Sequence, residues 1–246
     1  MTKIVFYLLL LIGLMECVAG QAQHNDSSRV KKNTVRLNLT GPMIFGNRYL
    51  VFGYERLVSN RQSFSINAGH AALPEYDSQP SDSVKFGKDS KNTGLNISAD
   101  YRFYLQKQNK FPAPRGVYVG PFYSYTGFKS NTTWNTTQSS FIETDTKFQI
   151  SAVGFELGYQ FVFWNRLAID MVMVGPGIGF YDLKVNVESN LTDEQKQELY
   201  KALEDRFGDR IPGMDYIFSQ SEFSTSGNAS LTSLGFRYIV HIGYRF

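Results

Sequence analysis

Three histidines, His24, His70 and His241, are the side chains of this chain best suited to acid or base chemistry near neutral pH. His70 is followed by Asp77 and Ser78, residue types that can together support acyl transfer. Their spacing is generic, so catalysis at His70 is the weaker hypothesis and we expect a protein that is not an enzyme. The sequence shows no glycine-rich phosphate loop and no metal-spaced cluster, so it predicts no cofactor and no bound metal.

A second chemically interesting set consists of charged residues that recur inside alternating, otherwise apolar segments. Arginines and carboxylates are matched in number within it, and an unpaired charge in an apolar interior costs several kcal/mol. We therefore expect a salt-bridged network inside the fold, with Asn38, Asn67 and Gln160 on the same faces. Its predicted members are Arg36, Glu55, Asp100, Arg102, Glu156, Asp170, Arg237, His241 and Arg245.

The N-terminus predicts export. Lys3 precedes an apolar stretch, Ile4 to Met15, and small residues follow it, which is typical of a secretory signal peptide. The stretch is shorter than the ~20 residues that a membrane-spanning helix needs. We expect a signal peptide over 1–22, cleaved after Gly20 or Ala22, and a periplasmic segment over 23–33. Cleavage would also remove the single cysteine of the chain.

The elements that must position the charged set are strands, because apolar and polar residues alternate with period two after residue 33. Turn signals divide this part into eight segments, and the connections between them alternate between short and long. That pattern predicts an all-β, antiparallel, up-and-down transmembrane β-barrel over 34–246, with short periplasmic turns and outward loops. The expected strands are 34–44, 49–58, 62–72, 93–105, 116–128, 145–163, 167–181 and 231–246.

Composition supports this class of protein. The chain of 246 residues is 42% hydrophobic, 15% aromatic and 19% charged, which excludes a disordered chain or a coiled coil. Its 25 basic and 22 acidic residues are too evenly balanced for nucleic-acid binding. A soluble sandwich would also alternate, but here charges share faces with Gly and Ser while bulky aromatics occupy the other faces. This division favours a membrane barrel.

Aromatic residues near the strand ends predict two girdles at the membrane interfaces. The periplasmic girdle is expected to contain Phe103, Phe161, Phe163, Trp164, Tyr244 and Phe246. The outer girdle is expected to contain Phe45, Tyr49, Tyr123, Tyr125, Phe128, Phe180 and Tyr181.

The chain ends at Phe246, with large apolar residues such as Tyr244 at every second position before it. This ending resembles the signal by which the barrel assembly machinery recognises bacterial outer-membrane proteins. The whole mature chain is similar to the eight-stranded outer-membrane barrels of the OmpX, OmpA-transmembrane and OmpW type. The Gly116–Phe122 and Tyr101–Leu105 segments more narrowly resemble an uncharacterised barrel family of Bacteroidota. The resemblance implies an outer-membrane location in contact with lipid and lipopolysaccharide.

One segment of the last outward loop, 182–230, predicts a helix. Leu191 to Phe207 begins with a capping-box pattern, carries apolar residues at i+4 spacing and is followed by a glycine. We expect its apolar stripe to pack on its own loop or over the barrel mouth, and the loop is the candidate surface for an extracellular partner.

Two functions follow from this interpretation. The first is a structural or interaction protein, with a charged plug closing the periplasmic half and loops that serve envelope integrity or adhesion. The second is an OmpW-like barrel that binds or passes a small apolar ligand in its outer half. The open question is whether Tyr118, Phe122 and the final loop enclose a cavity, because a pocket of a few hundred Å³ would favour the second function. A lipid A-modifying enzyme, with outward His70, is the least favoured function.

Overall fold

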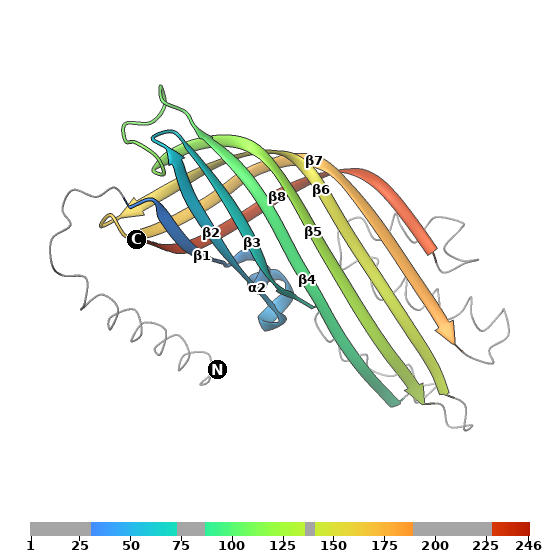
Figure 1. Ribbon diagram of the computed structural model, residues 1–246. Helices are drawn as coiled ribbons and strands as arrows, with labels where there is room; N and C mark the ends of the chain where they lie inside the picture. The colour runs from blue at the N-terminus through green and yellow to red at the C-terminus, as the bar shows by residue number, and fades with distance from the viewer. Residues whose placement is uncertain (1–30, 73–86, 136–140, 189–227) are drawn as a thin grey trace, which may run out of the picture. The chain divides into compact units, whose positions relative to one another are not determined.

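The computed structural model describes residues 31–72, 87–135, 141–188 and 228–246 (Figure 1). The chain divides into two compact units, Met1–Lys31 and Lys32–Phe246, and the second unit holds all of the described strands. The expected signal peptide lies outside the described residues, as does most of the segment expected over 23–33. Among the described residues, no helix is long and apolar enough to cross a membrane.

Eight antiparallel strands form a closed ring in which each strand pairs with the next and β8 pairs with β1 (Figure 1). The prediction of eight antiparallel strands is therefore confirmed. The strands are β1 (Asn33–Asn38), β2 (Tyr49–Ser59), β3 (Gln62–Ala71), β4 (Gly87–Tyr104), β5 (Gly116–Asn135), β6 (Phe141–Phe163), β7 (Leu167–Glu188) and β8 (Asn228–Arg245).

The first connection differs from its prediction. We expected β1 to reach residue 44 and a tight turn near Gly46, but β1 ends at Asn38. A short helix, α2 (Thr40–Phe45), and a 3₁₀ turn, η1 (Gly46–Arg48), follow it. The Asn38 side chain accepts the backbone N–H of Gly41 at 2.9 Å, which draws the chain out of the sheet. Pro42 has no N–H to donate, so the chain there cannot continue a full strand ladder.

Within the described ranges, α2 is the one α-helix, and it lies near the start of the barrel sequence. The helix expected over Leu191 to Phe207 lies outside the described residues. The fold prediction placed the helix of the barrel in the last loop, whereas the structure places a helix in the connection between β1 and β2. The local cause is a polar side chain that satisfies a free helix N–H, an interaction that the hydrophobic pattern does not reveal.

The early end of β1 leaves one edge of β8 without a strand partner over much of its length. The β1–β8 pairing stops at Asn38 and His241, whereas β8 continues to Asn228. The other edge of β8 pairs with β7 as far as Asn228. Just beyond the last pair, the side-chain oxygen of Thr40 accepts the Val240 N–H at 2.8 Å. Among the described strands, none pairs with this edge of β8 over residues 228–239.

Five strands also extend beyond their expected ends on the side of the long connections, namely β4, β5, β6, β7 and β8. Strand β5 runs to Asn135 and β6 begins at Phe141. The two strands pair without a break from Gly116 and Gln160 to Asn135 and Phe141. The extra residues of β4 and β5 are mostly Thr, Ser, Asn and Lys and carry no clear apolar alternation, whereas β7 continues to alternate with Leu183 and Val185. In β4 and β5, backbone hydrogen bonds continue the ladder after the hydrophobic pattern has ended, so the pattern alone places their ends too early.

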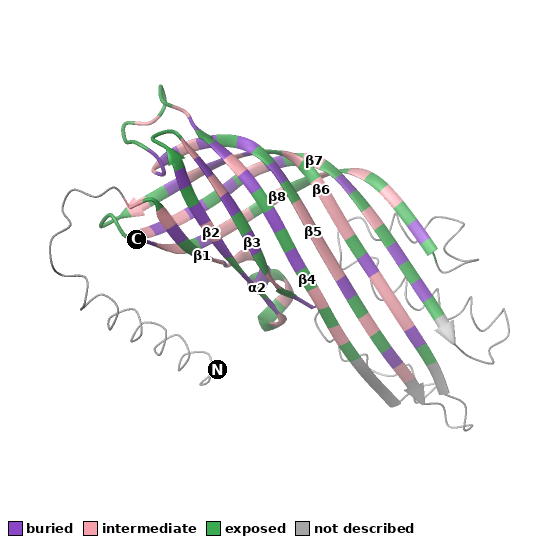
Figure 2. Cartoon of the chain, viewed as in Figure 1, coloured by how far each residue is buried: buried purple, intermediate pink, exposed green. Residues whose placement is uncertain are grey.

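More buried and more exposed residues alternate along most of the barrel wall (Figure 2). The distribution is the inverse of that in a water-soluble protein, because large apolar side chains point outward and charged ones point inward. On β6, for example, Phe155 is 68% exposed whereas the adjacent Glu156 is 2% exposed.

Two apolar clusters fill different levels of the interior. The first lies toward the outer ends of the long strands and contains Tyr49, Val51, Ala71, Phe128, Phe148, Leu183, Val185 and Ala229. Near the short turns, the second contains Leu57, Tyr104, Ala113 and Tyr118. The polar layer described below lies between the first cluster and the short turns, and it shares Tyr104 and Tyr118 with the second cluster.

The first cluster corrects the expected outer girdle. Tyr49 and Phe128 are buried inside the barrel, and Phe45 and Tyr181 pack against them. Phe128 is an odd number of residues from the outward Tyr123, so period two places the two rings on opposite faces. Distance from the strand end was therefore a poor guide to the face that a ring occupies.

Other aromatic residues lie outside the barrel. Phe103, Tyr123, Phe161, Phe163, Trp164, Phe180 and Phe246 are exposed. Tyr125 and Tyr244 are half-buried, and the Tyr125 hydroxyl accepts a hydrogen bond from Gln149 at 3.1 Å.

Candidate functional site

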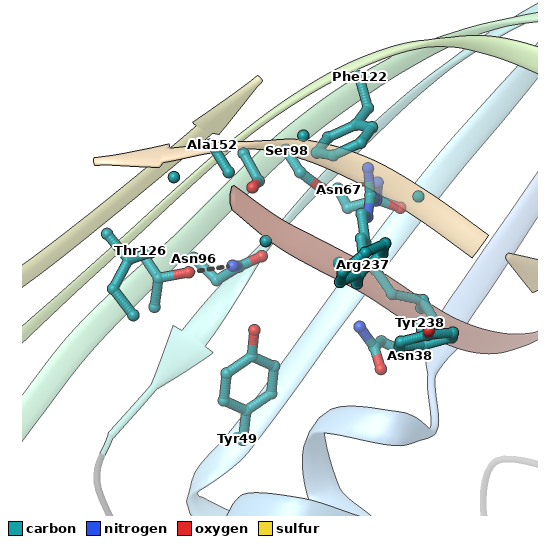
Figure 3. A pocket seen from close by; sticks show the side chains of 18 of the residues that line it. Asn38, Tyr49, Asn67, Asn96, Ser98, Phe122, Thr126, Ala152, Arg237 and Tyr238 are labelled. Carbon is teal, nitrogen blue, oxygen red and sulfur yellow. Dashed lines mark hydrogen bonds between the residues drawn. The ribbon is translucent and has the colours of Figure 1, made fainter. Parts of the chain in front are cut away.

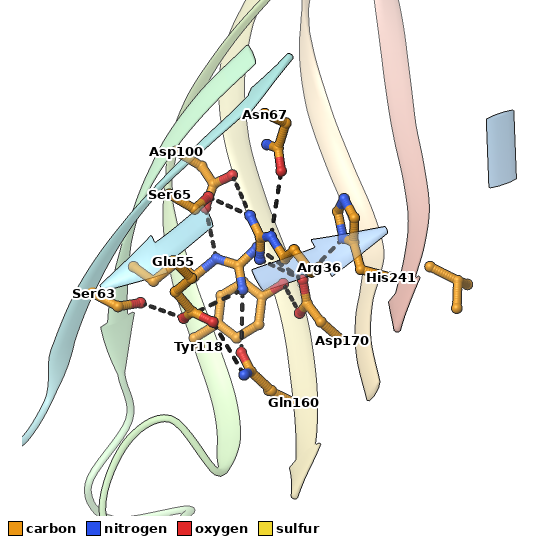
Figure 4. A network of polar contacts seen from close by, with 12 residues as sticks. Arg36, Glu55, Ser63, Ser65, Asn67, Asp100, Tyr118, Gln160, Asp170 and His241 are labelled. Carbon is orange, nitrogen blue, oxygen red and sulfur yellow. Dashed lines mark hydrogen bonds and ion pairs between the residues drawn. The ribbon is translucent and has the colours of Figure 1, made fainter. Parts of the chain in front are cut away.

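Side chains from all eight strands meet in one buried polar layer (Figure 4). Most belong to the predicted charged set, and the structure adds hydroxyl groups that the charge pattern does not reveal. The layer contains Arg36 from β1, Glu55 from β2, Ser63, Ser65 and Asn67 from β3, Asp100, Arg102 and Tyr104 from β4, Tyr118 from β5, Glu156 and Gln160 from β6, Asp170 from β7, and Arg237 and His241 from β8.

Arg102 lies at the centre of this layer and is completely buried. Its Nε is 2.6 Å from Asp100 Oδ2 and its Nη2 is 2.9 Å from Asp170 Oδ2. Its Nη1 donates to Gln160 Oε1 at 3.3 Å. The Arg102 guanidinium also lies 4.3 Å from the centroid of the Tyr118 ring, a cation–π contact. One side chain on β4 thus binds groups from β5, β6 and β7.

Asp170 is the main acceptor. Its Oδ2 receives Arg36 Nη1 at 3.0 Å and Arg102 Nη2 at 2.9 Å, and its Oδ1 receives the Tyr118 hydroxyl at 2.7 Å. His241 Nδ1 lies 3.2 Å from the same carboxylate. These donors come from four different strands, so one carboxylate on β7 links opposite walls of the barrel.

Glu55 anchors a second part of the layer, nearer the short turns. Ser63 donates to Glu55 Oε1 at 2.7 Å and the Tyr104 hydroxyl donates to it at 3.0 Å. Gln160 Nε2 donates to Glu55 Oε2 at 3.1 Å. Arg36 extends the layer on the other side, where it binds Ser65, donates to Asn67 Oδ1 at 3.3 Å and lies 3.5 Å from Asp100.

Eight residues of the predicted set form ion pairs within the layer, namely Arg36, Glu55, Asp100, Arg102, Glu156, Asp170, Arg237 and His241. Arg245 is buried at the end of β8 and donates to Asn165 Oδ1, in the β6–β7 turn, at 3.3 Å. Sequence reasoning missed Ser63, Ser65 and Tyr104 as members. Their signal was their phase, because Ser63 and Ser65 are separated from Asn67 by even numbers of residues, as Tyr104 is from Arg102, and therefore share its face of the strand.

A cavity of about 310 Å³ lies next to this layer, on the side of the long strand ends (Figure 3). Residues of the layer, among them Arg237 and His241, line one end of it. Its walls are largely aromatic and aliphatic, with Phe45, Tyr49, Phe122, Phe128, Phe148, Ile150 and Tyr181. Phe122 was one of the residues expected to enclose such a cavity. Tyr118, the other, is not part of the lining but belongs to the polar layer.

Glycines make room for the cavity and for Phe122. Gly175, Gly177 and Gly179 on β7 line it, and a Cβ atom at Gly177 would lie 3.2 Å from the Phe122 ring. On β8, the cavity lining runs from Gly235 to Ile239. This is part of the stretch of β8 that pairs with no described strand on one edge. The cavity therefore lies beside the least complete part of the described barrel wall.

His70 is placed apart from this layer. It is exposed and pairs with Leu50 of the neighbouring strand. Asp77, Ser78 and His24 lie outside the described residues, so catalysis at His70 stays a prediction. In the described ranges, no group of three or more His, Cys, Asp or Glu side chains is arranged to hold a metal ion.

No protein-family model matches the chain, and no curated protein matches it. Among solved structures, it is similar to CarO of Acinetobacter baumannii, with 7% identity and a TM-score of 0.38 over 90% of this chain and 99% of that one. A major outer membrane protein of Thermus thermophilus has 11% identity and a TM-score of 0.39, covering 87% and 98% of the two chains. Acinetobacter baumannii CarO2 has 11% identity and a TM-score of 0.37, covering 87% and 96%. With scores this low, the fold rests on the strand pairing of this chain itself.

Proposed function

We propose that the chain is an integral barrel of the bacterial outer membrane that binds a small, mainly apolar molecule and does not form an open pore. The observation that carries this proposal is the aromatic-lined cavity of about 310 Å³ above a continuous polar layer. The layer obstructs passage toward the short turns, whereas the cavity has the size of a small ligand site.

The outward face supports the membrane location. Each strand contributes an exposed apolar side chain, and an apolar belt this extensive on a protein surface indicates contact with lipid. The side chains of the alternate residues face a polar, ion-paired interior, as in barrels that span a membrane. One such outward residue from each strand, β1 to β8, is Val35, Phe52, Ile66, Ile97, Tyr123, Phe155, Ile178 and Leu234.

In this proposal, the barrel lies in outer-membrane lipid and lipopolysaccharide after export by the signal peptide expected over 1–22. The short turns face the periplasm, with Phe103 and Trp164 at that interface and Tyr123 nearer the outer one. Assembly would use the C-terminal strand signal that includes Tyr244 and Phe246. A structural or adhesive role through the loop over 182–230 stays a prediction, because most of that loop lies outside the described residues.

The membrane location is testable at Phe155, within the apolar belt of β6. Phe155→Arg should lower the free energy of unfolding in lipid vesicles by about 2–4 kcal/mol, because a cation there would face hydrocarbon. Asp182→Arg is the matched control, since Asp182 is also exposed but lies near the outer end of β7. Its effect should be about 0–1 kcal/mol. Equal effects of the two substitutions in urea unfolding from vesicles would contradict a lipid-facing Phe155.

Ligand binding is testable by filling the cavity. Ala152 lines it, whereas the next residue, Val153, is 48% exposed on the outer face. Ala152→Trp should weaken the binding of 1-decanol at least about tenfold because the indole would occupy the cavity, and Val153→Trp should leave binding unchanged. Methyl NMR can report this, with Ile150 in the cavity lining and the exposed Ile178 as the reference signal.

Both outcomes of the NMR experiment are informative. Changes at Ile150 but not at Ile178, lost in Ala152→Trp, are the expected result. If 1-decanol shifts both methyl signals equally, or if Ala152→Trp binds as well as the unaltered chain, then the cavity is not the binding site and the proposed function is wrong.

A further inference from the structure

One end of the cavity carries a charge that the apolar walls do not explain. Arg237 lines the cavity from β8, and its side chain is 9% exposed. Its Nη1 is 3.2 Å from Glu156 Oε2 and its Nη2 is 3.9 Å from Asp100 Oδ1. Neither η nitrogen makes a hydrogen bond to any described residue, although both are buried. Arg237 is therefore held by charge attraction, with hydrogen-bond donors still unused.

The amide side chains around the cavity are better satisfied. Asn67 accepts from Arg36 and donates to Ser98 at 3.0 Å. Asn96 donates to Thr126 at 2.7 Å (Figure 3). Since buried donors are almost always paired, the unused donors of Arg237 point to a ligand group that is not part of the described protein.

An anion could bind Arg237 without leaving its carboxylate neighbours unbalanced. Asp100 lies 2.6 Å from Arg102 and 3.5 Å from Arg36, and Glu156 lies 3.7 Å from Arg102. Each of the two carboxylates thus keeps another arginine nearby. A new acceptor at Arg237 would gain charge-assisted hydrogen bonds and would break no hydrogen bond that the Nη atoms now make.

The rest of the cavity is suited to a hydrocarbon group. The Arg237 guanidinium lies 4.8 Å from the centroid of the Phe122 ring, which continues the charged end into an aromatic wall. Beyond it lie Phe128, which stacks on Phe148 with ring centroids 6.1 Å apart, and Tyr49, which stacks on Phe45 at 5.3 Å. The cavity therefore combines one arginine at its end with walls that are mainly apolar and that also include Asn96, Ser98, Ser124 and Thr126.

We propose that the cavity binds a small amphiphile with one carboxylate group, whose charge is held by Arg237 and whose hydrocarbon part lies against Phe122, Phe128 and Phe148. This inference rests on the proposed function and names the chemical class of its ligand. A volume of about 310 Å³ is at the lower end for ligand sites, so a medium-length chain fits better than a long one.

The test compares decanoate with 1-decanol on the full chain in nanodiscs at pH 8, with the Ile150 methyl signal as readout. Decanoate should bind about tenfold or more tightly than the alcohol, because charge-assisted hydrogen bonds are roughly twice as strong as neutral ones. The double variant Arg237→Gln with Glu156→Gln leaves the net charge of the interior unchanged and should abolish this preference, so that decanoate binds no more tightly than 1-decanol.

Arg56→Gln is the matched control, because Arg56 is exposed on β2 and should not affect the preference. Heat-modifiable gel mobility shows whether each variant is folded, and Arg237→Lys provides a second variant that retains the cation but lacks the planar donor fork. Its preference for decanoate should fall severalfold. Equal binding of the two probes by the unaltered chain, or a preference that survives in the double variant, would overturn the inference alone. If neither probe shifts Ile150, the proposed function also fails.

Discussion

Replacing Arg102 with Met is expected to destabilise the barrel more than any other single substitution of its interior. Arg102 is completely buried and lies within 3.7 Å of Asp100, Asp170, Glu55 and Glu156. Met retains much of the side-chain volume but removes the charge. Several carboxylates would then face one another with too little positive charge between them. Removing one partner of a buried ion pair typically costs ~3–5 kcal/mol, and Arg102 contacts more than one partner.

The measurement is the free energy of unfolding in lipid vesicles, together with the fraction of chain that shows the folded mobility on an unheated gel. Arg56→Met is the matched control, because Arg56 is exposed and its bond to Asn33 Oδ1, at 3.2 Å, lies at the surface. Its cost should be below about 1 kcal/mol. An Arg102→Met barrel as stable as the control would show that the charges of the layer are not coupled as the distances indicate.

The second large expected effect concerns conductance. In planar bilayers the unaltered chain should show no stable current comparable to that of a general porin. All eight strands contribute side chains to the polar layer, and Glu55, Arg102, Tyr118 and Gln160 within it are 1% exposed or less. An eight-stranded barrel leaves room for side chains or for one small ligand, and side chains occupy this level.

A general porin inserted under the same conditions is the control for insertion and for current. A stable porin-sized conductance from the unaltered chain would contradict the closed layer. The cavity does not change this expectation, since it lies beside the layer and does not pass through it.

Much of the fold could be predicted because of one physical constraint, namely that alternate residues of a strand face opposite sides. Arg36, Asp100, Arg102 and Asp170 share faces with small or polar neighbours, and the structure places them together at one buried level. The balance of opposite charges had indicated ion pairing. The individual partners could not be predicted, because they depend on how far each strand is shifted along its neighbour.

The first connection shows where such reasoning fails. The apolar alternation around residues 34–44 favours a strand, but the Asn38 side chain accepts the Gly41 N–H and α2 forms instead. A single local hydrogen bond competes with several possible ladder bonds there, and the period of the sequence contains no information about the outcome. The consequence is large, because the short β1 leaves one edge of β8 without a described strand partner beside the cavity.

The sequence by itself determined the number of strands, their antiparallel order and the inverted distribution of charged and apolar residues, because all three follow from local periodicity and turn chemistry. Only the tertiary structure decided that Phe128 stacks on Phe148 inside the barrel and that Arg237 lies at one end of a cavity with unused donors. Those features depend on the register between strands, and register is a property of pairs of strands, so no single segment encodes it.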